Sequence, residues 1–140
     1  MIKLINLLKE NKILVPRRSP EERQKNYIIS IQKQIQQYIK NGSKGYLDLR
    51  DTPITSLPDN LKVGGSLNLY NTKITSLPDN LKVGGYLDLS NTKITSLPDN
   101  LKVGGGLYLS NTPLSKKYTQ DQIKKMIEDK GGNIGGNIIL

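Results

Sequence analysis

Apolar residues recur along the middle of the chain with a period of twenty residues. The segment 66–85 reads SLNLYNTKITSLPDNLKVGG, and the segment 86–105 repeats it with only three changes. An earlier copy spans 46–65 and a truncated copy spans 106–114, with no insertion between copies. A strict period of this length is typical of a solenoid, in which each repeat is one structural unit stacked on the next.

Each repeat combines two hydrophobic patterns. Leucines at alternate positions, such as Leu67 and Leu69, predict a short strand with one buried face. Ile74, Leu77 and Leu81 follow at spacings of three and four, which predicts an irregular return to the next strand. One repeat alone buries too little apolar surface to offset its ordering entropy, so the copies must stack. The predicted fold is an α/β solenoid with a parallel sheet of four to five strands.

The residues before the repeats predict a helix that caps the first turn of the solenoid. Residues 19–22 (SPEE) combine a capping serine, a proline in the first helical turn and a glutamate three residues after the cap, so a helix should begin there. Asn41-Gly42 should end it. Within this span Ile28, Ile31 and Ile35 lie at helical spacing and form one apolar stripe, which we expect to cover the first repeat.

Three further terminal elements are expected. A short helix near residues 2–10 precedes the cap, and residues 119–122 (TQDQ) should begin a second capping helix, which Gly131-Gly132 ends. Residues 137–140 could add a final strand to the sheet, because an open edge invites pairing with other chains. The expected organisation is one folding unit with an N-terminal helical cap (1–45), the repeats (46–114) and a C-terminal cap (115–140).

The repeats resemble the leucine-rich repeats, through two leucines followed by a polar and then an aliphatic residue: Leu67, Leu69, Thr72 and Ile74. Their period and the LPxxL segment are similar to the short repeats of secreted bacterial effectors, and comparable arrays occur in phage-encoded proteins. The resemblance implies a protein-binding solenoid. Two departures are that threonine replaces the usual asparagine, where its hydroxyl can bond the turn, and that glycine (Gly84 and its equivalents) replaces the first leucine, which should loosen the packing.

Composition and charge limit the chemistry. The chain lacks cysteine and histidine, which excludes disulfides, thiolate nucleophiles and the usual zinc ligands. This also excludes the cysteine-dependent ubiquitin-ligase activity of some effectors that the repeats resemble. We find no apolar run long enough to cross a bilayer and no export signal, so we expect a cytoplasmic protein of a bacterium or an infected host, with secretion as an effector left open. We expect no cofactor and no enzymatic activity.

The positions that vary between repeats suggest a binding surface. The segments 66–85 and 86–105 differ at the first, third and fifth positions, which alternate with buried leucines and therefore project from the exposed face of the sheet. The exposed return positions are identical. We interpret the variable face as a site for a protein partner, and a recent duplication with accidental changes is the alternative. The predicted binding residues are Tyr46, Asp48, Arg50, Ser66, Asn68, Tyr70, Tyr86, Asp88, Ser90 and Tyr108.

The basic N-terminal segment offers an alternative function. The formal net charge is +9, and residues 1–45 carry ten Lys and Arg against three Glu, whereas residues 46–112 carry six of each sign. A nucleic-acid backbone or another acidic surface could bind there. The residues of this alternative basic patch are Arg17, Arg18, Arg23, Lys25, Lys33 and Lys40. Self-association through the isoleucine stripe is a third possibility, if capping does not consume the stripe.

Two sets of aspartates have simpler explanations than chemistry. Asp59, Asp79 and Asp99 recur in equivalent turns, but each has a lysine three residues later, so we expect local hydrogen bonds and nearby lysines and no metal site. Asp48 and Asp88 lie two strands apart, which loosely resembles the spacing of paired catalytic carboxylates. Nothing else in the sequence supports catalysis.

Overall fold

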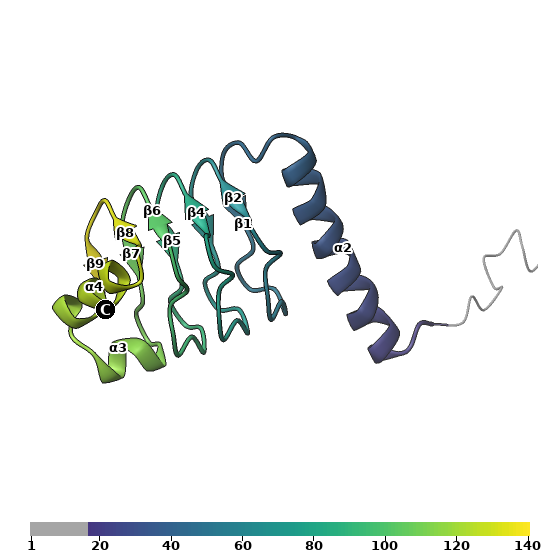
Figure 1. The fold of residues 1–140 in the computed structure, drawn as a ribbon. Coiled ribbons are helices and arrows are strands. Elements are labelled where there is room, and N and C mark those ends of the chain that lie inside the picture. Colours follow the sequence, from purple (N-terminus) through teal and green to yellow (C-terminus); the bar gives the residue numbers. More distant parts are fainter. Residues whose placement is uncertain (1–16) are drawn as a thin grey trace, which may run out of the picture.

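The computed structural model describes residues 17–140, which form a parallel-strand solenoid with helices at both ends (Figure 1). Helix α2 (Pro20–Lys40) lies at one end of the stacked turns, and helices α3 (Pro113–Lys117) and α4 (Gln120–Asp129) lie at the other. The predicted fold class is confirmed. The helix expected near residues 2–10 lies outside the described residues.

The leucine pairs of the repeats form the five-stranded sheet. Its parallel strands are β1 (Leu47–Asp48), β3 (Leu67–Asn68), β5 (Leu87–Asp88), β7 (Leu107–Tyr108) and β9 (Ile138–Ile139), in that order across the sheet. Equivalent residues stand opposite each other, so Leu67 pairs with Leu87 and Leu87 with Leu107. The strand β9 confirms the final strand that was expected at the C-terminus.

The return side of each repeat forms a second, four-stranded sheet, and the expectation of an irregular return is therefore wrong there. Its parallel strands are β2 (Lys62–Val63), β4 (Lys82–Val83), β6 (Lys102–Val103) and β8 (Asn133–Ile134). The physical reason is stacking: the Lys102 amide donates to the carbonyl of Leu81 in the preceding turn (3.0 Å). Val83 is 3% exposed, so it is also a core residue.

The apolar side chains form continuous internal ladders, as predicted. Leu67, Leu69, Ile74 and Leu81 are fully buried, and Leu77 is 8% exposed. The equivalent residues of the next repeat are buried in the same way. Each repeat therefore needs its neighbours to keep its apolar side chains away from water.

The glycine that replaces the first consensus leucine tightens the packing, contrary to the expectation from the sequence. A Cβ atom added to Gly84 would overlap the carbonyl oxygen of Gly64, and one added to Gly104 would overlap that of Gly84. Backbone therefore stacks directly on backbone at this corner of the solenoid. The Gly84 amide uses the close approach to donate to the Val63 carbonyl oxygen (2.8 Å).

An Asn-Thr pair shapes the turn after β3, β5 and β7. The Thr72 hydroxyl donates to the Leu69 carbonyl (2.8 Å), and the Thr92 hydroxyl donates to the Leu89 carbonyl (2.6 Å), which confirms the expected bond to the turn backbone. The preceding asparagine adopts a left-handed conformation, with φ of 55° at Asn71. Asparagine tolerates this conformation better than most side chains do.

Helix α2 begins and ends where the sequence predicts. The Glu22 amide donates to the Ser19 hydroxyl (3.1 Å) and the Ser19 amide donates to the Glu22 carboxylate (2.9 Å), which is the predicted capping box. Ile31 and Ile35 are buried against the repeats, whereas Ile28 is only half-buried. The stripe therefore caps the first turn along part of its length.

The C-terminal cap has one predicted helix and one that was not expected. Helix α4 begins at the capping residue Thr119, and its buried residues Ile123 and Ile127 cover the last turn. The unexpected helix α3 begins at Thr112, whose hydroxyl accepts a hydrogen bond from the Ser115 amide (3.1 Å). After β7, the helices α3 and α4 thus take the place of the usual return segment, and β8 and β9 then form the last strands of the two sheets.

Candidate functional site

The outward face of the five-stranded sheet brings together the residues that were predicted to bind a protein. We define the strand face as these residues together with Ile139: Tyr46, Asp48, Arg50, Ser66, Asn68, Tyr70, Tyr86, Asp88, Ser90 and Tyr108. Four tyrosines of this face are 37–48% exposed, and Ile139 is 39% exposed. Ile139 pairs with Tyr108 and extends the apolar surface beyond the residues that the sequence indicated.

Three of the tyrosines form a continuous aromatic strip across the repeats. The ring centroids of Tyr46 and Tyr86 lie 6.3 Å apart, and those of Tyr86 and Tyr108 lie 5.8 Å apart in an edge-to-face arrangement. A hydrogen bond with the side chain of Tyr46 raises the pKa of Tyr86 to about 12, and burial and the nearby Asp88 and Asp48 act in the same direction. The Tyr86 hydroxyl therefore keeps its proton to a higher pH than an isolated tyrosine does.

Two of the predicted binding residues are covered, not open. Asn68 is 8% exposed because its side-chain amide donates to the Tyr46 hydroxyl (3.0 Å) and its carbonyl oxygen accepts from the Tyr70 amide (2.9 Å). Ser90 is 9% exposed. The Tyr70 hydroxyl accepts a hydrogen bond from the side-chain amide of Asn91 in the next repeat (2.8 Å), so the Tyr70 side chain extends across to that repeat.

The charged groups of the strand face differ in their partners. Arg50 Nε lies 3.0 Å from Asp48 Oδ2, and this is the only ion pair within 4.0 Å found among residues 17–140. Asp88 is half-buried and accepts a hydrogen bond from the Ser90 amide (2.9 Å), but no described cation pairs with it. Asp48 thus has a cationic partner, whereas Asp88 has none among the described residues.

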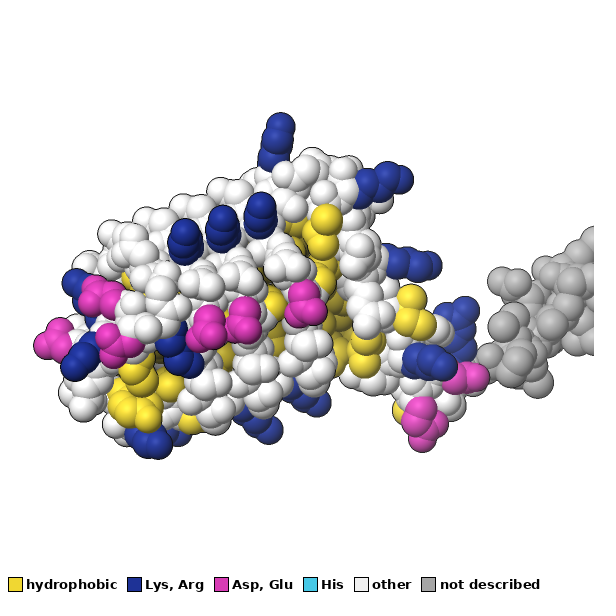
Figure 2. All heavy atoms as spheres, viewed as in Figure 1, with side chains coloured by type: hydrophobic (Ala, Val, Ile, Leu, Met, Phe, Trp, Pro, Cys, Tyr) yellow, Lys and Arg dark blue, Asp and Glu magenta, His cyan; other side chains and the backbone are white. Residues whose placement is uncertain are grey.

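The four-stranded sheet carries a separate row of charges. Lys62, Lys82 and Lys102 stand in register and are exposed, and Figure 2 shows lysines in a row above a row of acidic side chains. The aspartates of the preceding turns, Asp59, Asp79 and Asp99, are equivalent residues of successive repeats. The backbone amide of Asp99 donates a hydrogen bond to Asp79 Oδ1 in the repeat before it (3.0 Å). No lysine of residues 17–140 lies within 4.0 Å ion-pairing distance of these aspartates. Residues 17–140 contain no group of three or more acidic, histidine or cysteine side chains that could hold a metal ion.

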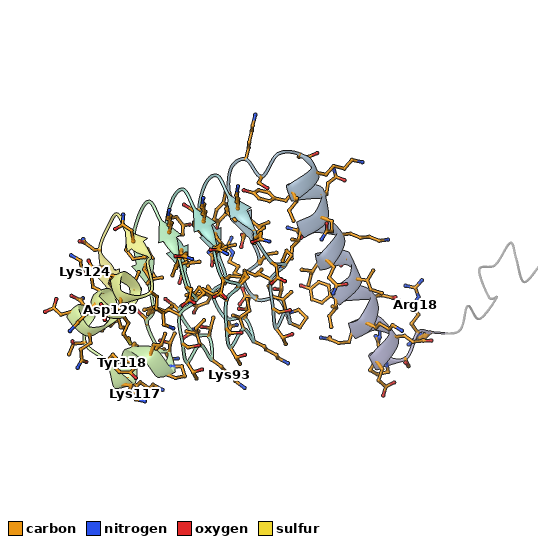
Figure 3. All side chains as sticks on the ribbon, viewed as in Figure 1. Arg18, Lys93, Lys117, Tyr118, Lys124 and Asp129 are labelled. Carbon is orange, nitrogen blue, oxygen red and sulfur yellow. The ribbon has the colours of Figure 1, made fainter. Side chains whose placement is uncertain are left out.

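The alternative basic patch is spread along the length of α2. Its six residues are exposed, and Lys33 and Lys40 fall on the side of the helix opposite Ile31 and Ile35, whereas Lys25 lies on the flank between the two sides. Arg18 lies at the far end of the helix from Lys40, and Figure 3 shows its side chain beside the start of α2. A helix of this length spans roughly 30 Å, so the patch is elongated.

A groove of mixed polar and apolar lining lies between α2 and the first repeat, and the sequence did not indicate it. The groove has a volume of about 500 Å³, and its lining includes Ile28, Ile35, Ile54 and Leu57 together with Gln32, Gln36, Thr55 and Ser56. Hydrophobic side chains are visible between the helix and the repeats in Figure 2. Ile28 and the exposed Ile29 also line a second open depression on α2. The pattern of isoleucines was the only available signal, and it indicated the capping stripe.

Comparisons with known proteins do not assign the chain. It matches no protein-family model, no curated protein and no solved structure. Among residues 17–140, no helix has the length and the apolar character that a membrane-spanning segment needs. A functional assignment must therefore start from the surfaces described above.

Proposed function

We propose that this chain is a non-enzymatic protein-binding module of the leucine-rich-repeat class, which binds its partner through the strand face. An effector or inhibitor of a host protein would suit its small size. The repeat pattern of Leu67, Leu69, Thr72 and Ile74 supports the class, together with the parallel solenoid that the pattern forms. Fold alone does not establish the role, so the proposal depends on the surface.

One observation carries the proposal. Eight large hydrophobic side chains of residues 17–140 are exposed, and five of them lie on the strand face: Tyr46, Tyr70, Tyr86, Tyr108 and Ile139. The other three lie on α2. Exposed apolar side chains gathered on one face mark interaction sites, and tyrosine is enriched among the residues that dominate binding energy.

The strand face is also preorganised. Tyr46, Tyr70 and Tyr86 are each held by a hydrogen bond to a neighbouring side chain or by an aromatic contact. Binding therefore costs little side-chain entropy, because these rings are already restricted in the free protein. A flat, rigid surface of this kind fits a folded protein partner.

The test compares affinity capture from host lysate by the wild type and by Tyr70→Ala/Tyr86→Ala, with and without nuclease. We expect a protein that the wild type retains and the double variant loses, whether or not nuclease is added. The matched control is Tyr27→Ala, which removes an exposed tyrosine from α2 (47% exposed) and should retain the protein. Loss with all variants, or capture that is equal for all, would contradict the proposal.

A second candidate function is the binding of nucleic acid, and the lysine row favours it. The charges of the repeats cancel in number, but Lys62, Lys82 and Lys102 lie together without a carboxylate partner among the described residues. Equivalent residues on neighbouring strands are about 4.8 Å apart, so the row is a dense line of positive charge. With the basic side of α2 it could follow a phosphate backbone.

Binding of single-stranded DNA at several salt concentrations tests this candidate. Replacing Lys62, Lys82 and Lys102 by glutamine should lower the slope of log affinity against log salt by about two, at roughly 0.7 per phosphate contact. An unchanged slope in this variant, together with a loss on charge reversal at Arg17, Arg18 and Arg23, would move the site to the alternative basic patch. Absence of salt-dependent binding would exclude the candidate.

A further inference from the structure

Asp88 lies among tyrosines at the centre of the strand face. Tyr86 precedes it by two residues on the same side of the strand, and Tyr108 stands opposite it on β7. Tyr70 borders the site from the preceding repeat, because its hydroxyl accepts a hydrogen bond from Asn91 (2.8 Å).

The equivalent position one repeat earlier shows why Asp88 stays accessible. Asn68 is 8% exposed because the Tyr46 hydroxyl, which accepts its hydrogen bond, covers it. The residue that occupies the place of Tyr46 relative to Asp88 is Ser66, whose hydroxyl accepts a hydrogen bond from the Tyr86 amide (3.0 Å). A serine cannot cover the carboxylate as the tyrosine ring does. Asp88 is correspondingly more exposed than Asn68.

The charge of Asp88 is also uncompensated within the described residues. Asp48, at the same position two strands away, has Arg50 at 3.0 Å. At the position equivalent to Arg50, the repeat of Asp88 has Ser90, whose amide bonds one carboxylate oxygen. The strand face therefore combines one free carboxylate with the edges and faces of aromatic rings.

We propose that Asp88, Tyr86 and Tyr108 form a binding site for an arginine side chain of the protein partner. A guanidinium group can donate a forked pair of hydrogen bonds to the Asp88 carboxylate and can stack on a tyrosine ring. Charge-assisted hydrogen bonds are the strong ones, and the rigid rings restrict where the group can lie. This inference rests on the proposed protein-binding function and specifies what the partner presents.

The site can be tested without knowing the partner. The probe is a blocked pentapeptide, Gly-Gly-Arg-Gly-Gly, followed by amide and tyrosine-ring NMR shifts of the full chain. We expect saturable shifts at residues 86–90 and at Tyr108, with the ring signals of Tyr27 unchanged. The same peptide with citrulline in place of arginine should bind at least tenfold more weakly, because citrulline keeps the shape but loses the charge. Equal binding of both peptides, or no saturable shift, overturns the proposal.

Asp88→Asn is the decisive variant. It should fold normally, because Asn68 already makes the equivalent turn bond to the amide two residues later (2.9 Å). We expect roughly tenfold weaker binding of the arginine peptide, the loss that accompanies a change from a charged to a neutral hydrogen bond. Asp59→Asn is the control, because it removes the same charge from a turn away from the strand face. Equal losses in the two variants would indicate a general charge effect and overturn the site.

Failure of this site and failure of the proposed function give different results. If Asp88→Asn leaves peptide binding unchanged while Tyr70→Ala/Tyr86→Ala still loses the captured protein, the arginine site is wrong and the strand face remains the binding surface. If the peptide binds at Asp88 but no strand-face variant affects the captured protein, the arginine site stands and the proposed function is wrong.

Discussion

The stacking of glycines at the corner of the solenoid predicts whether Gly84→Ala stabilises or destabilises the protein. If glycine loosened the packing there, Gly84→Ala would fill space and restrict the unfolded chain, and it would stabilise the protein by about 0.4–1 kcal/mol. The structure predicts the opposite. A Cβ at position 84 meets the Gly64 carbonyl, which is backbone and is held in the stack by its neighbours.

The magnitude of the effect follows from what must move. Relieving the overlap separates two turns and stretches the hydrogen bond from the Gly84 amide to the Val63 carbonyl, which is 2.8 Å long. Overpacking costs about 1–3 kcal/mol and a net hydrogen bond about 1 kcal/mol, so we expect a loss of about 2–4 kcal/mol. With a slope of roughly 1.5 kcal/mol per molar urea, the unfolding midpoint should fall by at least about 1 M.

The assay is urea unfolding followed by circular dichroism and by tyrosine fluorescence, since agreement of the two probes tests for a single transition. Gly106→Ser is the matched control, because the equivalent positions in the other repeats hold Tyr46, Ser66 and Tyr86. A Cβ at position 106 would lie 3.1 Å from the Asn137 carbonyl oxygen, which is a tight contact but not an overlap, so the midpoint of Gly106→Ser should fall much less than that of Gly84→Ala. A Gly84→Ala midpoint at or above that of the wild type would refute the claim that backbone contact limits this corner.

Three other predictions concern the turn, the strand face and the cap. Thr92→Val removes a buried hydroxyl that donates to the Leu89 carbonyl (2.6 Å), so it should lower the free energy of unfolding by about 1 kcal/mol in urea; an unchanged midpoint would mean that the bond contributes nothing. Tyr86 should titrate near pH 12 in ring NMR, and Tyr46→Phe should bring its pKa toward 10. Because this pKa is raised in the folded state, the associated stability is present below pH 10 and is lost between about pH 10 and 12; a titration near 10 in the wild type would contradict the tyrosine contact. Ile123→Ala should cost about 2–4 kcal/mol, because Ile123 is the fully buried residue by which α4 covers the last turn; a loss below about 1 kcal/mol in urea unfolding would show that α4 does not cap that turn.

The period and the caps are the parts of the fold that the sequence determines most directly. A twenty-residue repeat leaves one way to bury Leu67 and Leu69, which is against their own copies, and this sets the parallel register. Ser19 and Thr119 mark helix starts through local bonds alone. Features of this kind depend on neighbours in the sequence or on exact copies, so they can be predicted.

The second sheet was missed because its signal is short. Only Leu61, Lys62 and Val63 alternate before the glycines, and three residues do not establish a strand by themselves. The last strand of this sheet was available in the sequence: residues 133–140 (NIGGNIIL) follow the pattern of residues 102–109 (KVGGGLYL). Helices α3 and α4 lengthen the spacing to 31 residues, so the match falls outside the regular period.

Exposure on the strand face depends on side chains that lie more than one repeat apart. Tyr46 covers Asn68, and Tyr86 contacts Tyr108, at the same spacing of 22 residues. Strand alternation assigns all these residues to one face but does not indicate which ring covers which neighbour. The accessible Asp88 therefore became apparent only when Ser66 was placed beside it.

Part of the identity between the return segments has a structural cause, and this changes the argument for the strand face. The side-chain amide of Asn100 donates to Asn80 Oδ1 (3.0 Å), and the backbone amide of Asp99 donates to Asp79 Oδ1 (3.0 Å). These residues therefore bond to their own counterparts in the neighbouring repeat. A substitution in one repeat would remove hydrogen bonds to the repeats on both sides. This keeps these residues identical between repeats even without a recent duplication. The strand face lacks such ladders and is free to vary. Variation by itself is thus weak support for recognition, and the gathering of exposed tyrosines around Asp88 is the stronger argument. The exposed lysines at 82 and 102 form no side-chain ladder, and stacking does not explain their identity.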